Sequence, residues 1–421
     1  MTLTPAAGGT AGASLGLADI DVVSNAVYAD DVPFEQFARL RREAPVFRQR
    51  IPDPALVDEA WVISTQEFIR QVSLDTDSFS SNANGVRLDA QRVKEGLKVQ
   101  RGNFIMLDEP DHKQQRGRVS KGFTPRTVRT FEAAFRTLAA DIVTQALSGE
   151  REFDVVDRLA IHVPISAICT LLGVPEEYRG KVLEWSNAIV GMNDPESGGS
   201  REAAGAAVME VARLALELSE AKRANPADDL LSQLANLPAE ERLDDDELTG
   251  FVLLLLVAGN ESTRNTTTLG IEAFAHHPDQ LDWLAEDPES RMAGAVDEII
   301  RWASPLTYMA RTAVTDVEVG GQLIRAGDRV AMFYCSANRD EAVFDDPHAF
   351  RLDRENAYQH LAFGVGSHSC MGSSLARVEL AAVMSEFVAR VARVEIAGDV
   401  QRLQSSWVRG VKRLPIRVTL R

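Results

Sequence analysis

The stretch Phe363-Gly364-Val365-Gly366-Ser367-His368-Ser369-Cys370-Met371-Gly372 places one cysteine in a glycine-rich loop. A helical pattern follows at once, because the residues from Ser373 to Arg390 include apolar side chains at roughly helical spacing. A thiol at the start of such a helix faces free backbone N–H groups and the positive end of the helix dipole. Both favour the thiolate, which is the form of cysteine that binds a metal.

The glycines and the solitary cysteine indicate the kind of ligand. Gly364, Gly366 and Gly372 allow the loop to fold tightly and allow a flat ligand to approach its backbone. Cys370 supplies a single protein ligand, which argues against a closed zinc site. One strong thiolate suits an iron whose other ligands come from a porphyrin, and the alternative is a buried structural cysteine.

The pattern Phe-Gly-x-Gly-x-His-x-Cys-x-Gly resembles the haem-binding signature of the cytochrome P-450 monooxygenases. The resemblance implies haem b (iron protoporphyrin IX) with Cys370 as the ligand to the metal. In that family the thiolate pushes electron density towards cleavage of the O–O bond. Four further residues of the loop would contact the cofactor: Phe363, Gly364, His368 and Gly372.

Composition indicates a globular protein. The chain has 421 residues, of which 45% are hydrophobic and 25% charged. Residues 1–16 are small and polar, so we expect a disordered leader there. No Pro/Gly/Ser linker separates blocks in the rest of the chain, so we expect a single domain over residues 17–421. Three cysteines fit a reducing cytoplasm, and the most apolar run, Phe251 to Ala258, is too short to span a bilayer. A net charge of −17 argues against nucleic acid as a partner.

A pair of donors follows Pro110, which is suited to a helix start. His112 and Arg116 are four residues apart and would share one helical face, where they could clamp a carboxylate. The segment resembles the family's early helix, in which the matching His and Arg contact haem propionates. The resemblance implies this role for His112 and Arg116, and also for Arg311 and His368.

A basic run begins in the same segment. From Lys113 to Phe131 there is no acidic residue, whereas six are basic: Lys113, Arg116, Arg118, Lys121, Arg126 and Arg129. The run could be an ordinary solvated helix face. It could also dock an acidic electron donor, because opposite charges accelerate encounter. The resemblance favours a ferredoxin, since this helix lies on the cysteine side of the haem in the family.

The residues from Asp244 to His276 read as one long helix that is apolar all round its centre, which indicates burial. A glycine in such a helix costs about 1 kcal/mol relative to alanine. The small residue Gly259 would admit a flat ligand, and an acid beside a hydroxyl can relay protons to bound oxygen. The alternative is a hydrated kink.

This centre resembles the family's Ala-Gly-x-(Asp/Glu)-Thr pattern. Glu261 matches the acid, Ser262 stands where threonine is usual, and Thr263 follows. The resemblance implies that Ala258 and Gly259 lie beside the haem and that Glu261 works with one of the two hydroxyls. We hypothesise that Ser262 can substitute, because its hydroxyl also donates and accepts.

Glu298 and Arg301 are three residues apart on a predicted helix, a spacing that suits an ion pair. They resemble the family's Glu-x-x-Arg, a buried structural pair, and we assign them to folding and haem retention. The arginine that often completes this network is Ala349 here, so we expect Arg351 or Arg354 to close it.

Extended segments surround a predicted apolar pocket. Leu306 to Met309 reads as extended, Thr315 to Met332 as hairpin strands, and Leu403 to Leu420 as strands with a turn. The candidates for the substrate pocket are apolar residues of these segments and of the long helix: Leu254, Val257, Leu306, Met309, Trp407 and Val408.

The resemblance covers about Pro33 to Leu420 and implies a mainly α fold with a small β region, in which a long central helix crosses the haem above the cysteine loop. The implied reaction is hydroxylation with O2, with electrons from NAD(P)H through a separate ferredoxin and ferredoxin reductase. Residues 258–265, 336–341 and 408–417 look like family branches that act on sterols, branched lipids and terpenoids. A haem-thiolate peroxygenase and a non-catalytic haem sensor remain as alternatives.

Overall fold

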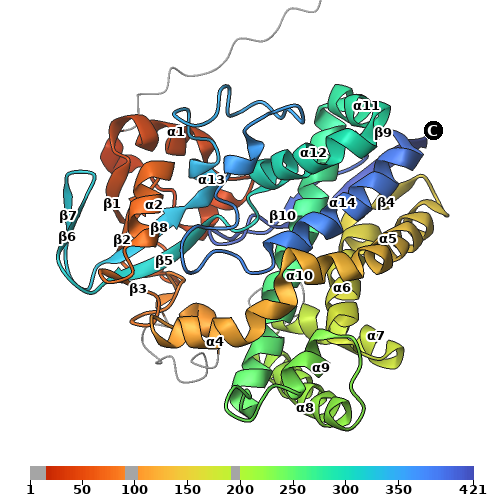
Figure 1. Ribbon diagram of the computed structural model, residues 1–421. Coiled ribbons are helices and arrows are strands. Elements are labelled where there is room, and N and C mark those ends of the chain that lie inside the picture. Colours follow the sequence, from red (N-terminus) through yellow and green to blue (C-terminus); the bar gives the residue numbers. More distant parts are fainter. Residues whose placement is uncertain (1–15, 91–102, 191–199) are drawn as a thin grey trace, which may run out of the picture.

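The structure is a computed structural model that describes residues 16–90, 103–190 and 200–421. Residues 1–15 of the expected leader lie outside the described residues. The described chain forms a large body of helices beside a smaller region of strands near the N-terminal helices (Figure 1). This arrangement agrees with the predicted mainly α fold.

The helices account for most of the described chain. They are α1 (Phe34–Glu43), α2 (Gln66–Leu74), α4 (Asp111–Ser120), α5 (Pro125–Leu147), α6 (His162–Leu172), α7 (Glu176–Val190), α8 (Arg201–Ala224), α9 (Leu230–Ala235), α10 (Asp245–His276), α11 (Pro278–Glu286), α12 (Pro288–Ala303), α13 (Tyr334–Ala337) and α14 (Ser373–Arg390). None of the described helices is both long and apolar enough to cross a membrane.

The strands form small sheets. They are β1 (Val46–Arg50), β2 (Glu59–Ile63), β3 (Phe79–Ser80), β4 (Glu152–Asp154), β5 (Tyr308–Ala313), β6 (Val317–Val319), β7 (Gln322–Ile324), β8 (Arg329–Phe333), β9 (Val391–Ile396), β10 (Gln401–Arg402), β11 (Val411–Arg413) and β12 (Pro415–Leu420). The largest sheet has the order β1-β2-β8-β5-β3, so it joins the N-terminal strands to the segment after α12.

Local capping explains where the long helix α10 begins. Asp244 accepts a hydrogen bond from the backbone N–H of Glu247, and the Glu247 side chain accepts one from the backbone N–H of Asp244. This capping box satisfies donors that a helix start leaves free. The helix then runs for 32 residues through the middle of the molecule (Figure 1).

Packing around α10 positions the loop that carries the cysteine. Helix α14 packs along α5, and α10 packs against α6, α8 and α12. A core of buried aliphatic and aromatic residues joins α5, α10, α12 and α14 to strands β9 and β12. The loop before α14 is therefore anchored to a rigid base at its C-terminal end.

Candidate active site

The cysteine loop is closed by its own backbone. The N–H of Cys370 donates to the carbonyl of Phe363 at 2.7 Å, so the first and eighth residues of the motif meet. Gly364 and Gly366 have φ of +66° and +81°, which favour glycine. A Cβ on Gly366 would also lie 2.9 Å from the carbonyl oxygen of Ser73, too close for any other residue.

Cys370 is accessible, unlike the other two cysteines of the chain. Its thiol nevertheless lies deep within the protein, and burial raises its pKa although the N–H of Gly372 and the charges of Arg116 and Arg377 lower it. The N–H of Gly372 thus acts in the direction expected of a helix start, but burial outweighs it and the net pKa of the thiol is raised. An accessible thiol in a deep position fits a cofactor that covers the sulfur and brings positive charge to it.

Two histidines stack beside this loop. The rings of His112 and His368 have centroids 4.0 Å apart at an interplanar angle of 30°. Burial lowers the pKa of His368 to about 2, with help from the charges of Arg311, His112 and Arg116, so its ring is neutral. Nδ1 of His112 contacts Glu109 at 3.1 Å, a residue that lies just before the start of α4.

Two ring nitrogens of this cluster have no hydrogen-bond partner in the part of the chain that the structure describes. Nε2 of His112 and Nδ1 of His368 are buried without a hydrogen-bond partner among the described residues. Arg311 is 5% exposed, and its guanidinium donates to the carbonyl of Ala310 at 2.8 Å. A cavity of about 20 Å³ is lined by Arg311 and His368 together with Met309. The guanidinium of Arg311 and the imidazoles of His112 and His368 are groups that fit the two carboxylates of a haem.

Helix α10 presents one accessible position in its buried centre. Ala258 is exposed, whereas Leu256 and Asn260 are 2% and 0% exposed. The hydroxyl of Ser262 donates to the carbonyl of Ala258 at 2.7 Å, one turn earlier on the same face. Leu254 lies one turn before Ala258 and continues this face.

Gly259 lies on a different face of α10. A Cβ on this residue would be 3.1 Å from Cδ1 of Ile168, so the missing side chain leaves room for Ile168 of α6. Thr263 is one turn further along the same face and is 5% exposed. Of the two candidate hydroxyls, that of Ser262 therefore shares a face with the accessible Ala258.

Only one of the two carboxylate oxygens of Glu261 accepts hydrogen bonds from described residues. Its Oε1 accepts hydrogen bonds from Arg264 at 2.5 Å and from Asn265 at 2.9 Å. Its Oε2 is buried without a hydrogen-bond partner among the described residues. One oxygen is thus held in place and the other can still accept a hydrogen bond.

Glu298 and Arg301 form a fully buried ion pair, with both side chains 0% exposed and a closest approach of 2.6 Å. Arg301 also donates to the carbonyls of Asn338 at 2.7 Å and Pro347 at 3.0 Å. Of the two arginines expected to close the network, Arg354 supplies a side chain, 3.2 Å from Glu298.

The predicted pocket residues come from segments that meet. Leu306 and Val408 form an antiparallel bridge, and the N–H of Thr307 donates to the carbonyl of Trp407 at 3.0 Å. The guanidinium of Arg87 lies 4.2 Å from the centroid of the Trp407 ring. The remaining candidate, Val257, is half-buried on α10.

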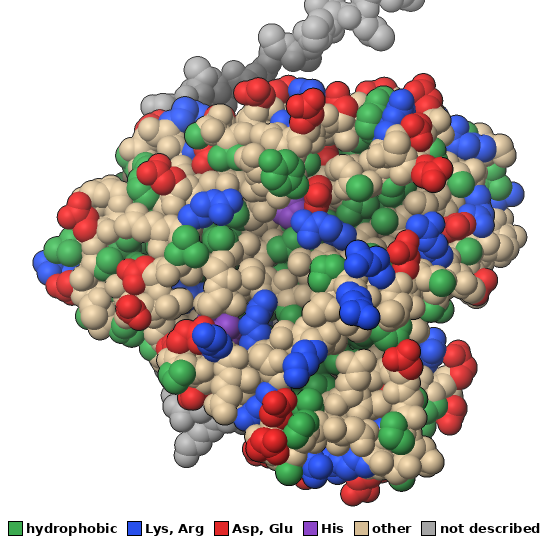
Figure 2. Space-filling model, in the orientation of Figure 1, with side chains coloured by type: hydrophobic (Ala, Val, Ile, Leu, Met, Phe, Trp, Pro, Cys, Tyr) green, Lys and Arg blue, Asp and Glu red, His purple; other side chains and the backbone are tan. Residues whose placement is uncertain are grey.

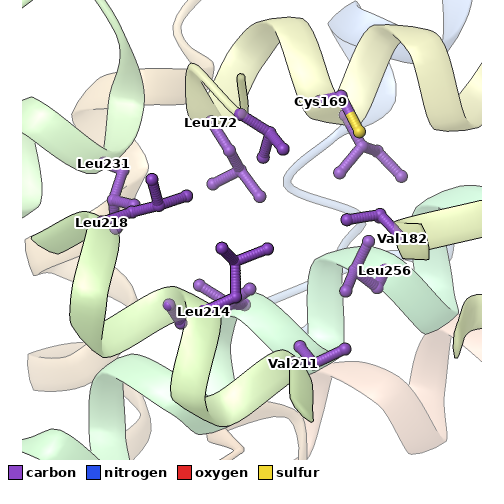
Figure 3. Close-up of a pocket in the computed structure, with 12 residues that line it drawn as sticks. Cys169, Leu172, Val182, Val211, Leu214, Leu218, Leu231 and Leu256 are labelled. Carbon is purple, nitrogen blue, oxygen red and sulfur yellow. The ribbon is translucent and has the colours of Figure 1, made fainter. Parts of the chain in front are cut away.

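Another cavity of about 20 Å³ lies among α6, α7, α8, α9 and α10. Its lining is apolar, with Leu172, Leu214 and Leu256 pointing inwards (Figure 3). Val252 and Leu256 line it from the face of α10 that also bears Gly259. This cavity is therefore not the space that Ala258 faces, about 200° round the helix from Leu256.

The basic run lies on the same side of the molecule as the cysteine loop. Figure 2 shows Lys and Arg side chains across the middle of this face, over α14 and the adjoining parts of α4 and α5, with acidic side chains mostly towards the rim. Lys113, Lys121, Arg126 and Arg129 are exposed. Arg118 pairs with Glu247 at 2.8 Å, and the exposed Lys121 lies 3.8 Å from Glu241.

Comparisons with known proteins agree on one family. Residues 203–405 match the family model described as Cytochrome P450. The chain is 38% identical to a steroid C26-monooxygenase of Rhodococcus jostii, over 93% of this chain and 83% of the relative. It is 37% identical to a methyl-branched lipid omega-hydroxylase of Mycobacterium bovis, over 97% and 96% respectively. A solved cytochrome P450 of Mycobacterium marinum in complex with pseudoionone superimposes with a TM-score of 0.86 at 33% identity, covering 94% of this chain and 98% of that chain.

Proposed function

The chain belongs to the cytochrome P450 family of haem-dependent monooxygenases, and we propose that it hydroxylates the terminal carbon of a methyl-branched hydrophobic chain. The observation that carries this proposal is that two relatives, each aligned over more than nine-tenths of this chain, are named for such a position. C26 is the end of a sterol side chain, and omega is the end of a lipid. A branched aliphatic end is the feature that the two substrates share.

We assign the cofactor contacts to the residues around the cysteine loop. When bound, haem b supplies the iron at which O2 is activated with electrons derived from NAD(P)H. Cys370 is the proposed ligand to the metal. The proposed donors to the propionates are the residues with unfilled hydrogen-bonding capacity or buried charge: His112, Arg116, Arg311 and His368.

We assign the proton relay to Glu261 and Ser262. Oε2 of Glu261 has no described partner and can accept a hydrogen bond from a water molecule of the relay, while Arg264 and Asn265 hold the other oxygen. The hydroxyl of Ser262 can pass a proton on, because it both donates and accepts. Its bond to the carbonyl of Ala258 fixes it at the accessible face of α10.

The proposed electron donor is a ferredoxin, reduced by a separate reductase. The exposed residues Lys113, Lys121, Arg126 and Arg129 give this face a positive charge within a chain of net charge −17. An acidic donor would be steered to the face nearest the cysteine loop.

The first test is the absorption spectrum of the reduced, carbon-monoxide-bound protein beside a Cys370→Ser variant. Thiolate ligation by Cys370 predicts a strongly red-shifted Soret band that the variant lacks. The same band in the variant would remove Cys370 as the ligand.

The second test concerns the position of oxidation. Cholesterol and phytanic acid would each be incubated with ferredoxin, reductase and NADH, and the products analysed by mass spectrometry. The proposal expects a primary alcohol at the branched end of at least one of them. Oxidation at ring or mid-chain carbons alone would contradict it, and turnover with peroxide alone would favour a peroxygenase.

A further inference from the structure

The carboxylate of Asp297 has no proposed contact with the haem, but it lies close to two side chains that contact the cysteine loop. Asp297, on α12, lies 2.8 Å from Nε of Arg377 on α14 and 3.5 Å from Nε2 of His360, measured to the same oxygen. The first distance is that of a charge-assisted hydrogen bond. The second is too long for a strong hydrogen bond but short enough for electrostatic attraction.

The two side chains near Asp297, those of Arg377 and His360, both contact Phe363, the first residue of the cysteine motif. The guanidinium of Arg377 lies 4.7 Å from the centroid of the Phe363 ring. The ring of His360 lies 5.4 Å from the same centroid. Because the carbonyl of Phe363 accepts the N–H of Cys370 at 2.7 Å, the cluster reaches the cysteine through a single residue.

The tautomer of His360 follows from its neighbours. Its Nδ1 accepts a hydrogen bond from the N–H of Ala362 at 3.2 Å, so a neutral ring carries its proton on Nε2, the nitrogen nearest Asp297. Burial lowers the pKa of His360 despite the attraction of Asp297, which keeps the ring neutral. The charged pair in the cluster is therefore Asp297 with Arg377.

We propose that Asp297 is a positioning residue for the haem thiolate, because it fixes Arg377 against Phe363 so that the charges of this pair set the reduction potential of the iron. The proposal rests on the proposed function in one respect, the ligation of iron by Cys370. The path from the pair to the sulfur is short, because Arg377 lies over the ring of Phe363 and the carbonyl of Phe363 accepts the N–H of Cys370. Groups around a first ligand commonly tune a metal in this way.

The two members of the pair should act in opposite directions. Reduction adds an electron near Cys370, so a positive charge nearby favours it and a negative charge opposes it. Arg377→Gln should therefore make the haem harder to reduce, and Asp297→Asn should make it easier. The double variant should lie close to the parent protein, because the net charge of the pair is restored to zero.

The experiment is a spectroelectrochemical titration of the haem-loaded protein and its variants. We expect each single change to alter the ratio of reduced to oxidised haem about threefold at a fixed potential, which is about 30 mV for a one-electron couple. Arg390→Gln is the matched control. Arg390 lies on the same helix, is paired with Glu386, and has a side chain 35% exposed against 37% for Arg377.

Opposite shifts with a silent control would support the proposal. Shifts of the same sign in both single variants would indicate a structural role and overturn it, as would a control shift of equal size. If Arg377→Gln fails to bind haem, Arg377→Lys retains the charge and should keep the parent potential, and a threefold change there would also overturn it. Loss of the red-shifted carbon monoxide band in the parent protein would instead remove the proposed thiolate ligation.

Discussion

Replacing Glu298 by glutamine is a direct test of the buried charge network beneath the cysteine loop. The Glu298 carboxylate contacts Nε of Arg301 at 2.6 Å and Nε of Arg354 at 3.2 Å. Glutamine preserves its size but removes the negative charge between two guanidinium groups. We expect the variant to fold less stably and to lose haem more readily.

The size of the effect follows from burial. Removing one partner of a buried ion pair costs about 3–5 kcal/mol, because the other charge remains buried without compensation. Arg301 keeps its bonds to the carbonyls of Asn338 and Pro347, which favours a value near the middle of that range. At about 2.1 cal/mol/K per residue, a 421-residue chain unfolds with an entropy of roughly 0.9 kcal/mol/K, so a loss of about 4 kcal/mol lowers Tm by about 4–5 °C.

The assay is thermal unfolding followed by circular dichroism, with all proteins heated at one rate because large haem proteins commonly unfold irreversibly. Glu355→Gln, an exposed acid in the loop beyond Arg354, is the control and should change Tm little. Adding Arg354→Gln to the Glu298 variant removes one uncompensated charge and should recover part of the loss. If Glu298→Gln melts within 1 °C of the control, the charge network does not stabilise the fold as argued.

Three further outcomes are expected. Burial is the largest single influence on Asp31 and raises its pKa, but the charge and hydrogen bond of Arg409, the charge of Arg402 and the N–H of Val32 together outweigh it, so the net pKa lies below its ordinary value of about 3.9. Asp31→Asn should therefore reduce stability to urea at pH 7, and this cost should shrink as the pH falls through the folded-state pKa; an equal cost at pH 3 would contradict the assignment. Ser262→Ala should divert consumed O2 to hydrogen peroxide, and unchanged coupling of NADH oxidation to product would exclude a relay role. Lys113→Gln with Lys121→Gln should slow reduction by a ferredoxin at low salt and flatten its salt dependence, whereas identical rates would move the docking surface elsewhere.

Elements with strong local signals were predictable from the sequence. The long helix was expected over Asp244 to His276, and α10 spans Asp245–His276 after its Asp244 cap. The helix expected from Ser373 to Arg390 has those bounds as α14. In both cases the start is set by residues within one turn, a capping box in α10 and the end of a glycine-rich loop in α14. Such signals need no knowledge of the tertiary structure.

Which neighbouring element each side of α10 packs against was not predictable from the sequence. A helix that is apolar all round has no amphipathic pattern to say which side meets which neighbour. Gly259 was expected beside the haem, and its packing against Ile168 of α6 becomes visible only in the structure. The choice between Ser262 and Thr263 depended on the same missing information. The contact between Asp297 and Arg377 was not predictable for a related reason, since the two residues are 80 positions apart in the sequence.

The surroundings of Cys370 act on its pKa in two opposite directions, and only one of them was predictable from the sequence. A helix start contributes about 0.3–1 kcal/mol to a neighbouring negative charge. Burial of an ionisable group acts in the opposite direction, because it penalises the charged form. Burial prevails at Cys370, and the N–H of Gly372 with the charges of Arg116 and Arg377 offsets only part of it. If Cys370 binds the haem iron as proposed, the positive charge of the metal would supply the stabilisation of the thiolate that the protein groups do not.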